Sequence, residues 1–282
     1  MKAVKQNLLI LLGLGIMALN LSPVFAQNQP LSLKSSAALV LDQKTGLVLY
    51  EKNAQKVVPI ASITKLMTAM VLLDSKPDKA GTITIAKADI DTLRGSRSRL
   101  PVGTSLSLRE MLRLALMSSE NRAASALSRN FPGGKAAFVK AMNRKARALG
   151  MTHSHFRDPT GLYRENVSTA RDLARLVSAA AKYPLIRQLT TTKSYRQKVG
   201  RKIVKFNNTN ILTKNPQWKI GLSKTGFINE SGKCLVMQTW LNNRPVIIVL
   251  LDSWGVLTPV GDSNRIKHWL DTVSASVYQG QG

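Results

Sequence analysis

The sequence predicts a mixed fold of the α/β (α+β) class, in which strands from both ends of the chain complete one mostly antiparallel sheet. Two short apolar runs, residues 36–41 and 47–50, flank a turn-forming segment and predict a β-hairpin. Apolar residues at helical spacing dominate the middle of the chain, and strand-like apolar runs return in its last third. Helices and strands that are segregated in this way favour helices on the faces of a sheet, with a helical insert between its two halves.

Proline, glycine and capping residues mark the ends of the elements that follow the hairpin. A serine followed three residues later by glutamate is a capping box at a helix start. Glycine just after an apolar run, or proline beyond it, marks a helix end. The predicted elements are a helix that carries Ser62 and Lys65 and breaks at 74–81, a strand over 82–86, a helix from the Ser107/Glu110 capping box to 118–121, a helix that follows residues 132–134 and ends before Gly150, and a helix over 170–182.

The last third of the chain is predicted to be mostly strands. Residues 219–225 form one strand, and residues 234–241 and 246–251 form a second hairpin, before a closing helix over 264–273. Residues 190–215 carry mixed polar signals and give no clear element. The single cysteine of the chain, Cys234, excludes an internal disulfide, and its apolar setting predicts a small buried side chain.

The first 26 residues are typical of a secretory signal peptide. Lys2 and Lys5 precede an apolar stretch over residues 8–19, and Ala26 is a small residue at the expected cleavage point. A membrane span needs about 20 apolar residues, so this stretch is short for one, although an uncleaved anchor is the alternative. The sequence therefore predicts export, with residues 27–282 forming one soluble domain without a stable membrane anchor.

The chain is strongly basic, with a formal net charge of +26. Such a charge would favour nucleic acid as the partner of a cytosolic protein. Export and the absence of a basic motif with interleaved aromatic residues argue against nucleic acid here. An anionic envelope polymer or a carboxylate-rich substrate is a better match, and a solvated surface that aids solubility is an equally good explanation.

Three short motifs occur in an order that points to acyl transfer by a serine. Ser62 and Lys65 are three residues apart at a helix start, so the lysine can reach the serine hydroxyl, and a neutral amine there could take its proton. Alone, this pair fits a helix cap with a solvated lysine just as well. Two further motifs follow, Ser119-Glu120-Asn121 at the end of an apolar helix and Lys224-Thr225-Gly226 at the end of a strand. The ordered triple is the set that penicillin-binding proteins and class A β-lactamases use.

In these motifs the chain resembles the low-molecular-mass penicillin-binding proteins that act as D-alanyl-D-alanine carboxypeptidases and endopeptidases. The resemblance covers nearly the whole exported chain, is closest to the endopeptidase branch, and rests on residues 59–69, 116–124, 168–173 and 224–227. It implies a β-lactamase/transpeptidase-like fold, with a five-stranded antiparallel sheet flanked by helices and an all-helical subdomain. Carboxypeptidase members usually add a β-rich domain and a C-terminal anchor, and the end at Gly282 favours the shorter endopeptidase type.

The resemblance also implies a role for each motif residue in a covalent mechanism through Ser62. Lys65 would be the general base, with its pKa lowered by burial and by a second cation, for which Lys224 is the candidate. Ser119 would relay a proton to the leaving amine, and Asn121 would hold the substrate amide and orient Lys65. The remaining expected contacts are Lys224 and Thr225 with the substrate carboxylate, Gly226 with the substrate backbone, and the N–H groups of Ser62 and Phe227 with the oxyanion.

No cofactor or metal is expected. His153 and His155 would lie on one side of a strand, but no carboxylate or cysteine set completes a metal site. A second Ser-x-Asn motif, Ser128-Arg129-Asn130, lies past the expected bend and ranks below Ser119.

The expected function is cleavage of D-alanyl cross-links in peptidoglycan in the periplasm, with penicillins as covalent inhibitors. Carboxypeptidase activity would use the same serine and is the first alternative. A β-lactamase would need a glutamate that activates the deacylating water, and Glu165 lacks the usual Glu-x-x-Leu-Asn setting. A basic cell-wall-binding protein with an inactive acylation site is the alternative from a different class.

Overall fold

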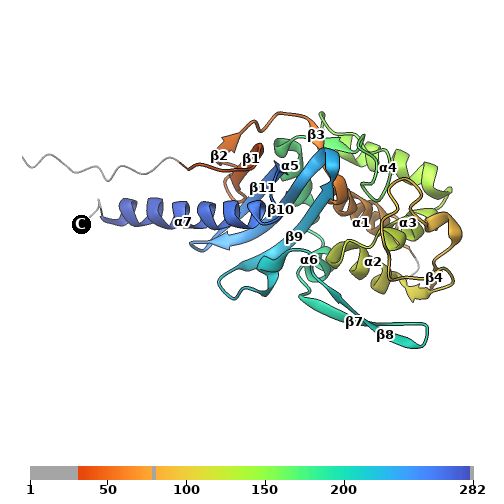
Figure 1. Cartoon of the computed structure of the whole chain (residues 1–282). Coiled ribbons are helices and arrows are strands. Elements are labelled where there is room, and N and C mark those ends of the chain that lie inside the picture. The colour runs from red at the N-terminus through yellow and green to blue at the C-terminus, as the bar shows by residue number, and fades with distance from the viewer. Residues whose placement is uncertain (1–30, 78–80, 280–282) are drawn as a thin grey trace, which may run out of the picture.

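The computed structural model describes residues 31–77 and 81–279 (Figure 1). The predicted signal peptide over residues 1–26 therefore lies outside the described residues.

A five-stranded sheet in the order β2-β1-β11-β10-β9 forms the centre of the molecule, and all of its neighbouring strands are antiparallel. This confirms the predicted sheet built from both ends of the chain. The β10–β11 hairpin turns through Asn242 and Asn243, which both have positive φ, as a tight two-residue hairpin turn requires. The sheet strands are β1 (Ala37–Asp42), β2 (Val48–Lys52), β9 (Lys219–Ile228), β10 (Gly232–Leu241) and β11 (Arg244–Ser253).

Helices cover both faces of the sheet and extend past one end of it (Figure 1). On one face, Leu39 and Val249 pack in the core that α1 and α5 share. On the other face, Val40 and Ile248 pack with Ile266 of α7. The helices are α1 (Thr64–Asp74), α2 (Leu108–Met117), α3 (Asn121–Arg129), α4 (Gly134–Ala148), α5 (Ala170–Ala180), α6 (Pro184–Thr190) and α7 (Thr258–Gln279).

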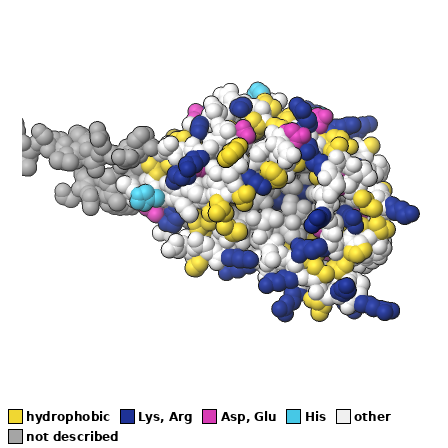
Figure 2. All heavy atoms as spheres, in the orientation of Figure 1, with side chains coloured by type: hydrophobic (Ala, Val, Ile, Leu, Met, Phe, Trp, Pro, Cys, Tyr) yellow, Lys and Arg dark blue, Asp and Glu magenta, His cyan; other side chains and the backbone are white. Residues whose placement is uncertain are grey.

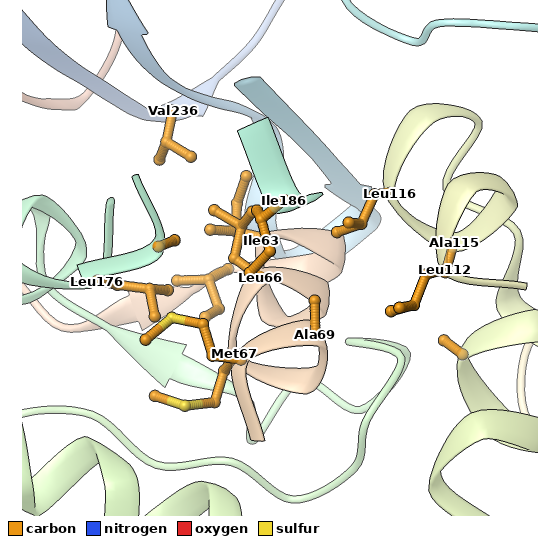
Figure 3. Close-up of a cluster of buried hydrophobic side chains, with 14 of the residues drawn as sticks. Ile63, Leu66, Met67, Ala69, Leu112, Ala115, Leu116, Leu176, Ile186 and Val236 are labelled. Carbon is orange, nitrogen blue, oxygen red and sulfur yellow. The ribbon is translucent and has the colours of Figure 1, made fainter. Parts of the chain in front are cut away.

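Helix α1 runs through the middle of the larger core, and residues 64–72 are all buried. Figure 3 shows Leu66 and Met67 of this helix among side chains from other elements, including Leu116 of α2, Ile186 of α6 and Val236 of β10. Because neighbours surround α1 on every side, its polar residues are also removed from water. This position matters for Lys65 below.

The predicted helix ends are confirmed where capping residues marked them. The Ser107 backbone N–H donates to Glu110 Oε2 at 2.9 Å, and the Glu110 N–H donates to Ser107 Oγ at 3.3 Å, which is the predicted capping box. Thr169 Oγ1 accepts from the Asp172 N–H at the start of α5. Gly150 follows α4 with a φ of +70°, as a glycine at this position allows.

Several elements differ from the prediction. Helix α3 begins at Asn121, where only the end of α2 was expected, and α6 begins at Pro184, because proline that stops one helix also suits the first position of the next. The polar stretch 190–215 contains the hairpin β7–β8. Helix α7 is longer than the predicted 264–273. The smaller elements are β3 (Val58–Pro59), β4 (Thr82–Thr84), β5 (Ser105–Ser107), β6 (Val167–Ser168), β7 (Ser194–Val199), β8 (Lys202–Asn207) and the 3₁₀ turns Ala61–Ile63, Lys87–Asp89, Ile211–Lys214 and Asn229–Ser231.

The basic residues are spread over the surface and not gathered in one patch on the face seen in Figure 2. Among the helices of the described chain, none has both the length and the apolar character needed to cross a bilayer.

Candidate active site

Ser62 lies in the 3₁₀ turn Ala61–Ile63, directly before α1, and Lys65 lies in the first turn of that helix. Lys65 Nζ is 2.7 Å from Ser62 Oγ, so the lysine reaches the hydroxyl as the three-residue spacing predicts. Ala61 has a φ of +45°, an uncommon value for a residue with a side chain. The backbone is therefore bent sharply where it delivers Ser62.

Two further oxygens surround the Lys65 amine. Asn121 Oδ1 and the Thr160 carbonyl oxygen each lie 2.7 Å from Nζ, and neither can donate a hydrogen bond to it. The Asn121 amide is held in this orientation because its Nδ2 donates to Ser96 Oγ at 2.9 Å. A neutral amine has two N–H donors and one lone pair. Its donors therefore satisfy Asn121 and Thr160, and its lone pair is left for the Ser62 hydroxyl.

Burial lowers the pKa of Lys65 from 10.5 to about 7, against the opposing effects of the Asp158 and Glu120 carboxylates. The side chain is 1% exposed. Burial, one of the two expected causes, is therefore the main cause of this shift. Lys224 is buried beside it, and burial, followed by repulsion between the two lysines, lowers the pKa of Lys224 well below 10.5.

Lys224 is also buried and connects the second and third motifs. Its Nζ donates to Ser119 Oγ at 3.0 Å and to the Thr225 carbonyl oxygen at 2.8 Å. Ser119 has a φ of +61°, in the sharp turn between α2 and α3 that presents its hydroxyl to the site. Thr225 Oγ1 donates to Thr209 Oγ1 at 2.6 Å, so the loop before β9 holds the third motif in place.

Two glycines allow the backbone to approach the Ser62 peptide closely. A Cβ atom on Gly226 would lie 2.7 Å from the Ile60 carbonyl oxygen and 3.2 Å from the Ser62 nitrogen. A Cβ on Gly161 would overlap the Ala61 carbonyl oxygen. Gly226 lies on β9, an edge strand of the five-stranded sheet. One side of this strand is therefore open to pairing with an extended peptide.

The three motifs meet at one groove of about 380 Å³. The side chain of Phe227 is 51% exposed at its rim and packs under the Lys233 ammonium, 3.3 Å from the ring centroid. Phe227 can therefore contribute to the inside of the groove only through its backbone. The predicted residues that line the groove are Ser62, Ser119, Asn121, Thr225, Gly226 and Phe227, with Lys65 and Lys224 buried behind them.

Comparison with known proteins identifies the family. A family model described as D-alanyl-D-alanine carboxypeptidase, Peptidase S11, matches residues 24–254. The chain belongs to this family.

Its relatives include both endopeptidases and carboxypeptidases. The peptidase is 52% identical to the D-alanyl-D-alanine endopeptidase of Pseudomonas aeruginosa over 259 residues, which cover 90% of this chain and 84% of the relative. It is 44% identical to the D-alanyl-D-alanine endopeptidase of Escherichia coli over 247 residues, which cover 87% and 79% of the two chains. It is therefore a D-alanyl-D-alanine peptidase, a hydrolase, and the resemblance seen in the sequence is confirmed.

Solved structures confirm the penicillin-binding fold. The Streptomyces K15 DD-transpeptidase superposes with a TM-score of 0.78 at 29% identity, over 84% of this chain and 97% of that one. Penicillin-binding protein D2 of Listeria monocytogenes, in its cefotaxime-bound form, superposes with a TM-score of 0.75 at 30% identity, over 86% and 99% of the two chains.

Sequence reasoning missed several residues that shape the site of the peptidase. Ser96 lies in the polar, basic loop over residues 94–99, which carries no catalytic motif, and Thr160 acts through a backbone carbonyl that no side-chain motif reveals. Asp158 is buried and accepts the N–H groups of Thr160 and Gly161. The Asp158-Pro159-Thr160-Gly161 turn was the signal that could have drawn attention to this loop.

The competing candidates lie elsewhere. Ser128 is fully buried inside α3 and donates to the Ser125 carbonyl oxygen, so the second Ser-x-Asn motif supports the helix. Glu165 is exposed and does not line the groove beside Ser62. Cys234 is 2% exposed, as predicted, and burial raises the pKa of its thiol to about 11. In the described part of the chain no group of three or more potential metal ligands is found, around His153 and His155 or elsewhere.

Proposed function

We propose that this peptidase is a periplasmic D-alanyl-D-alanine endopeptidase that opens peptidoglycan cross-links through an acyl-enzyme on Ser62. The observation that supports this most is the environment of Lys65. A buried amine with a pKa of about 7, two fixed acceptors and a serine hydroxyl at 2.7 Å is suited to remove the proton of that hydroxyl.

In the first step, Ser62 Oγ attacks the D-alanyl carbonyl carbon while Lys65 takes the hydroxyl proton. The carbonyl oxygen becomes negatively charged, and the backbone N–H groups of Ser62 and Phe227 are proposed to stabilise it. The close approach of Gly226 to the Ser62 nitrogen supports this arrangement, because it brings the two backbone segments together.

In the second step, the C–N bond breaks and the leaving amine needs a proton. Ser119 Oγ, 3.0 Å from Lys224 Nζ, is proposed to relay it from the lysines to the nitrogen. Lys224 and Thr225 are proposed to bind the carboxylate on the leaving side, which would favour the charged form of Lys224. Water then attacks the ester on Ser62 and releases the acyl product, which restores the enzyme.

The same site is proposed to react with β-lactams, whose leaving group stays attached after the ring opens. The adduct would block water, so penicillins would inhibit the enzyme by slow release. The exposed position of Glu165, outside the groove, favours inhibition over the rapid turnover of a β-lactamase.

We propose endopeptidase rather than carboxypeptidase activity because the relatives with the higher sequence identity are endopeptidases. Those at 52% and 44% identity are named endopeptidases, whereas the carboxypeptidases of Bacillus subtilis and Streptomyces match at 31% and 30%. We further propose that residues 1–26 direct export and are removed, leaving residues 27–282 in the periplasm.

Digestion of purified cross-linked muropeptides tests the proposal. The wild-type protein should convert dimers to monomers and should form a covalent adduct with fluorescent penicillin, and Ser62→Ala should do neither. Ser118→Ala is the matched control, because its hydroxyl only donates to the Leu114 carbonyl oxygen. A wild-type protein that neither cleaves dimers nor takes up the label would refute the proposal. Removal of only the terminal D-alanine would support carboxypeptidase activity instead.

A further inference from the structure

A second cavity of about 670 Å³ adjoins the catalytic groove. Its walls are residues 88–93, the first turns of α4 and residues 157–163, and we call it the α4 cleft. Asn121 lines both the groove and the cleft, and Thr160, whose carbonyl oxygen accepts from Lys65, lines the cleft as well. The volume is within the usual range for ligand sites. The two cavities are thus neighbours that share Asn121.

The carboxylates that line the cleft are engaged by the wall itself. Asp91 accepts the backbone N–H groups of residues 93, 94 and 96, and Asp89 forms an ion pair with Arg129 at 2.9 Å. Asp158 accepts the N–H groups of Thr160 and Gly161. These carboxylates hold the loops in shape through their own hydrogen bonds, and none of them forms an ion pair with a cation that lines the cleft.

The cations of the cleft are exposed. Lys135, Lys140 and Arg157 line it, all three are exposed, and none forms an ion pair with a described residue. Lys135 and Ala136 belong to the first turn of the 15-residue helix α4, whose positive end faces the same space. The α4 cleft therefore presents three exposed cations that have no ion-pair partner among the described residues.

We propose that the α4 cleft binds the acyl-side peptide of the substrate through free carboxylates on that peptide. This inference rests on the proposed function, which assigns the leaving side of the scissile bond to Lys224 and Thr225 and the substrate amide to Asn121. The acyl chain that continues past Asn121 then enters the α4 cleft. Stem peptides of peptidoglycan carry free carboxylates, which Lys135, Lys140 and Arg157 can pair with.

Two synthetic substrates with the same D-alanyl bond and the same leaving amino acid test the inference. One keeps free carboxylates on its acyl side, and the other carries amides there. The wild-type enzyme should prefer the carboxylate substrate by about tenfold in kcat/KM, since each exposed ion pair contributes about a two- to fivefold factor. The triple variant Lys135→Gln/Lys140→Gln/Arg157→Gln should lose this preference, mainly through KM.

The triple variant Lys198→Gln/Lys202→Gln/Arg196→Gln is the matched control, because it removes the same charges from the exposed β7–β8 hairpin. It should keep the preference, and 0.5 M salt should weaken the preference in both it and the wild type. Equal kcat/KM for the two substrates, or a preference that survives in the cleft variant, would overturn the inference. Cleavage of the amide substrate and penicillin labelling report on the proposed function separately, and both should be unchanged in the cleft variant.

Discussion

The rate at which penicillin acylates Ser62 should rise with pH through about 7. Only the neutral form of Lys65 can accept the Ser62 proton, and its pKa is about 7. The neutral fraction is then about a tenth at pH 6, half at pH 7 and nine-tenths at pH 8. The second-order rate constant for labelling by fluorescent penicillin, measured by stopped flow from pH 5 to 9, should therefore increase about tenfold from pH 6 to pH 8. Loss of the Lys224 proton should oppose this rise, because the pKa of Lys224 is lowered well below 10.5 and the neutral amine no longer attracts the penicillin carboxylate.

A charge change beside Lys65 tests whether this residue sets the midpoint. Glu120 raises the pKa of Lys65, so Glu120→Gln should move the midpoint to lower pH and increase the rate at pH 6 relative to the plateau. Glu165→Gln removes an exposed carboxylate outside the groove and is the matched control. A flat profile from pH 5 to 8, a midpoint that Glu120→Gln leaves in place, or full activity in Lys65→Arg would refute the assignment of Lys65 as base.

Thermal unfolding over the same pH range separates the loss of catalysis from the loss of structure. Unfolded Lys65 keeps its proton up to 10.5, whereas the folded residue loses it near 7. Between these values the unfolded state holds more protons, so the contribution of Lys65 to the free energy of unfolding rises with pH. The difference between 10.5 and about 7 corresponds to about 5 kcal/mol. At or below pH 7 the free energy of unfolding is lower by this amount than it is above pH 10.5. The Lys65 contribution should therefore be constant from pH 5 to 6 and should raise the melting temperature between pH 7 and 9.

Three further outcomes are expected. Gly161→Ala should lower the free energy of unfolding by more than about 2 kcal/mol and abolish penicillin labelling, since its Cβ would collide with the Ala61 carbonyl oxygen; unchanged melting would contradict this. Ser96→Ala should slow acylation about tenfold at an unchanged melting temperature, because the Asn121 amide loses its orientation, and Ser96→Thr should restore the rate. Cys234 should not react with a thiol reagent in the native protein at pH 8 and should react fully in denaturant, because burial raises its pKa to about 11.

The sequence predicted those parts of the fold that local chemistry decides. The hairpin around residues 42–46 and the box formed by Ser107 and Glu110 depend on turn and capping groups within a few residues of one another. Helix α3 was missed because residues 121–129 are polar on average and short helices are marginal without packing. Its alanines and Leu127 become buried only once neighbouring elements surround them. The β7–β8 hairpin likewise depends on partners that the local pattern does not reveal.

The candidate site was predictable through its side-chain motifs and not through its backbone. Ser62, Ser119 and Lys224 occur in motifs with fixed spacing and order. The Thr160 carbonyl oxygen is a main-chain atom that any residue could supply, so the residue type does not identify it as part of the site. Ser96 was hidden for another reason, since its contact with Asn121 joins residues 25 positions apart.

The protonation state of Lys65 depends on the whole fold, whereas its distance from Ser62 depends only on the local helix. Spacing along one helix turn brings Nζ within 2.7 Å of Ser62 Oγ, and an exposed helix would do the same. Such a lysine would keep its proton at pH 7 and could not serve as a base. Because residues 64–72 of α1 are all buried, water is removed from Lys65 as a consequence of packing the core. Substitutions that loosen the packing around Leu66 or Leu116 should therefore raise the pKa of Lys65 and slow acylation at pH 7, although neither side chain touches the substrate.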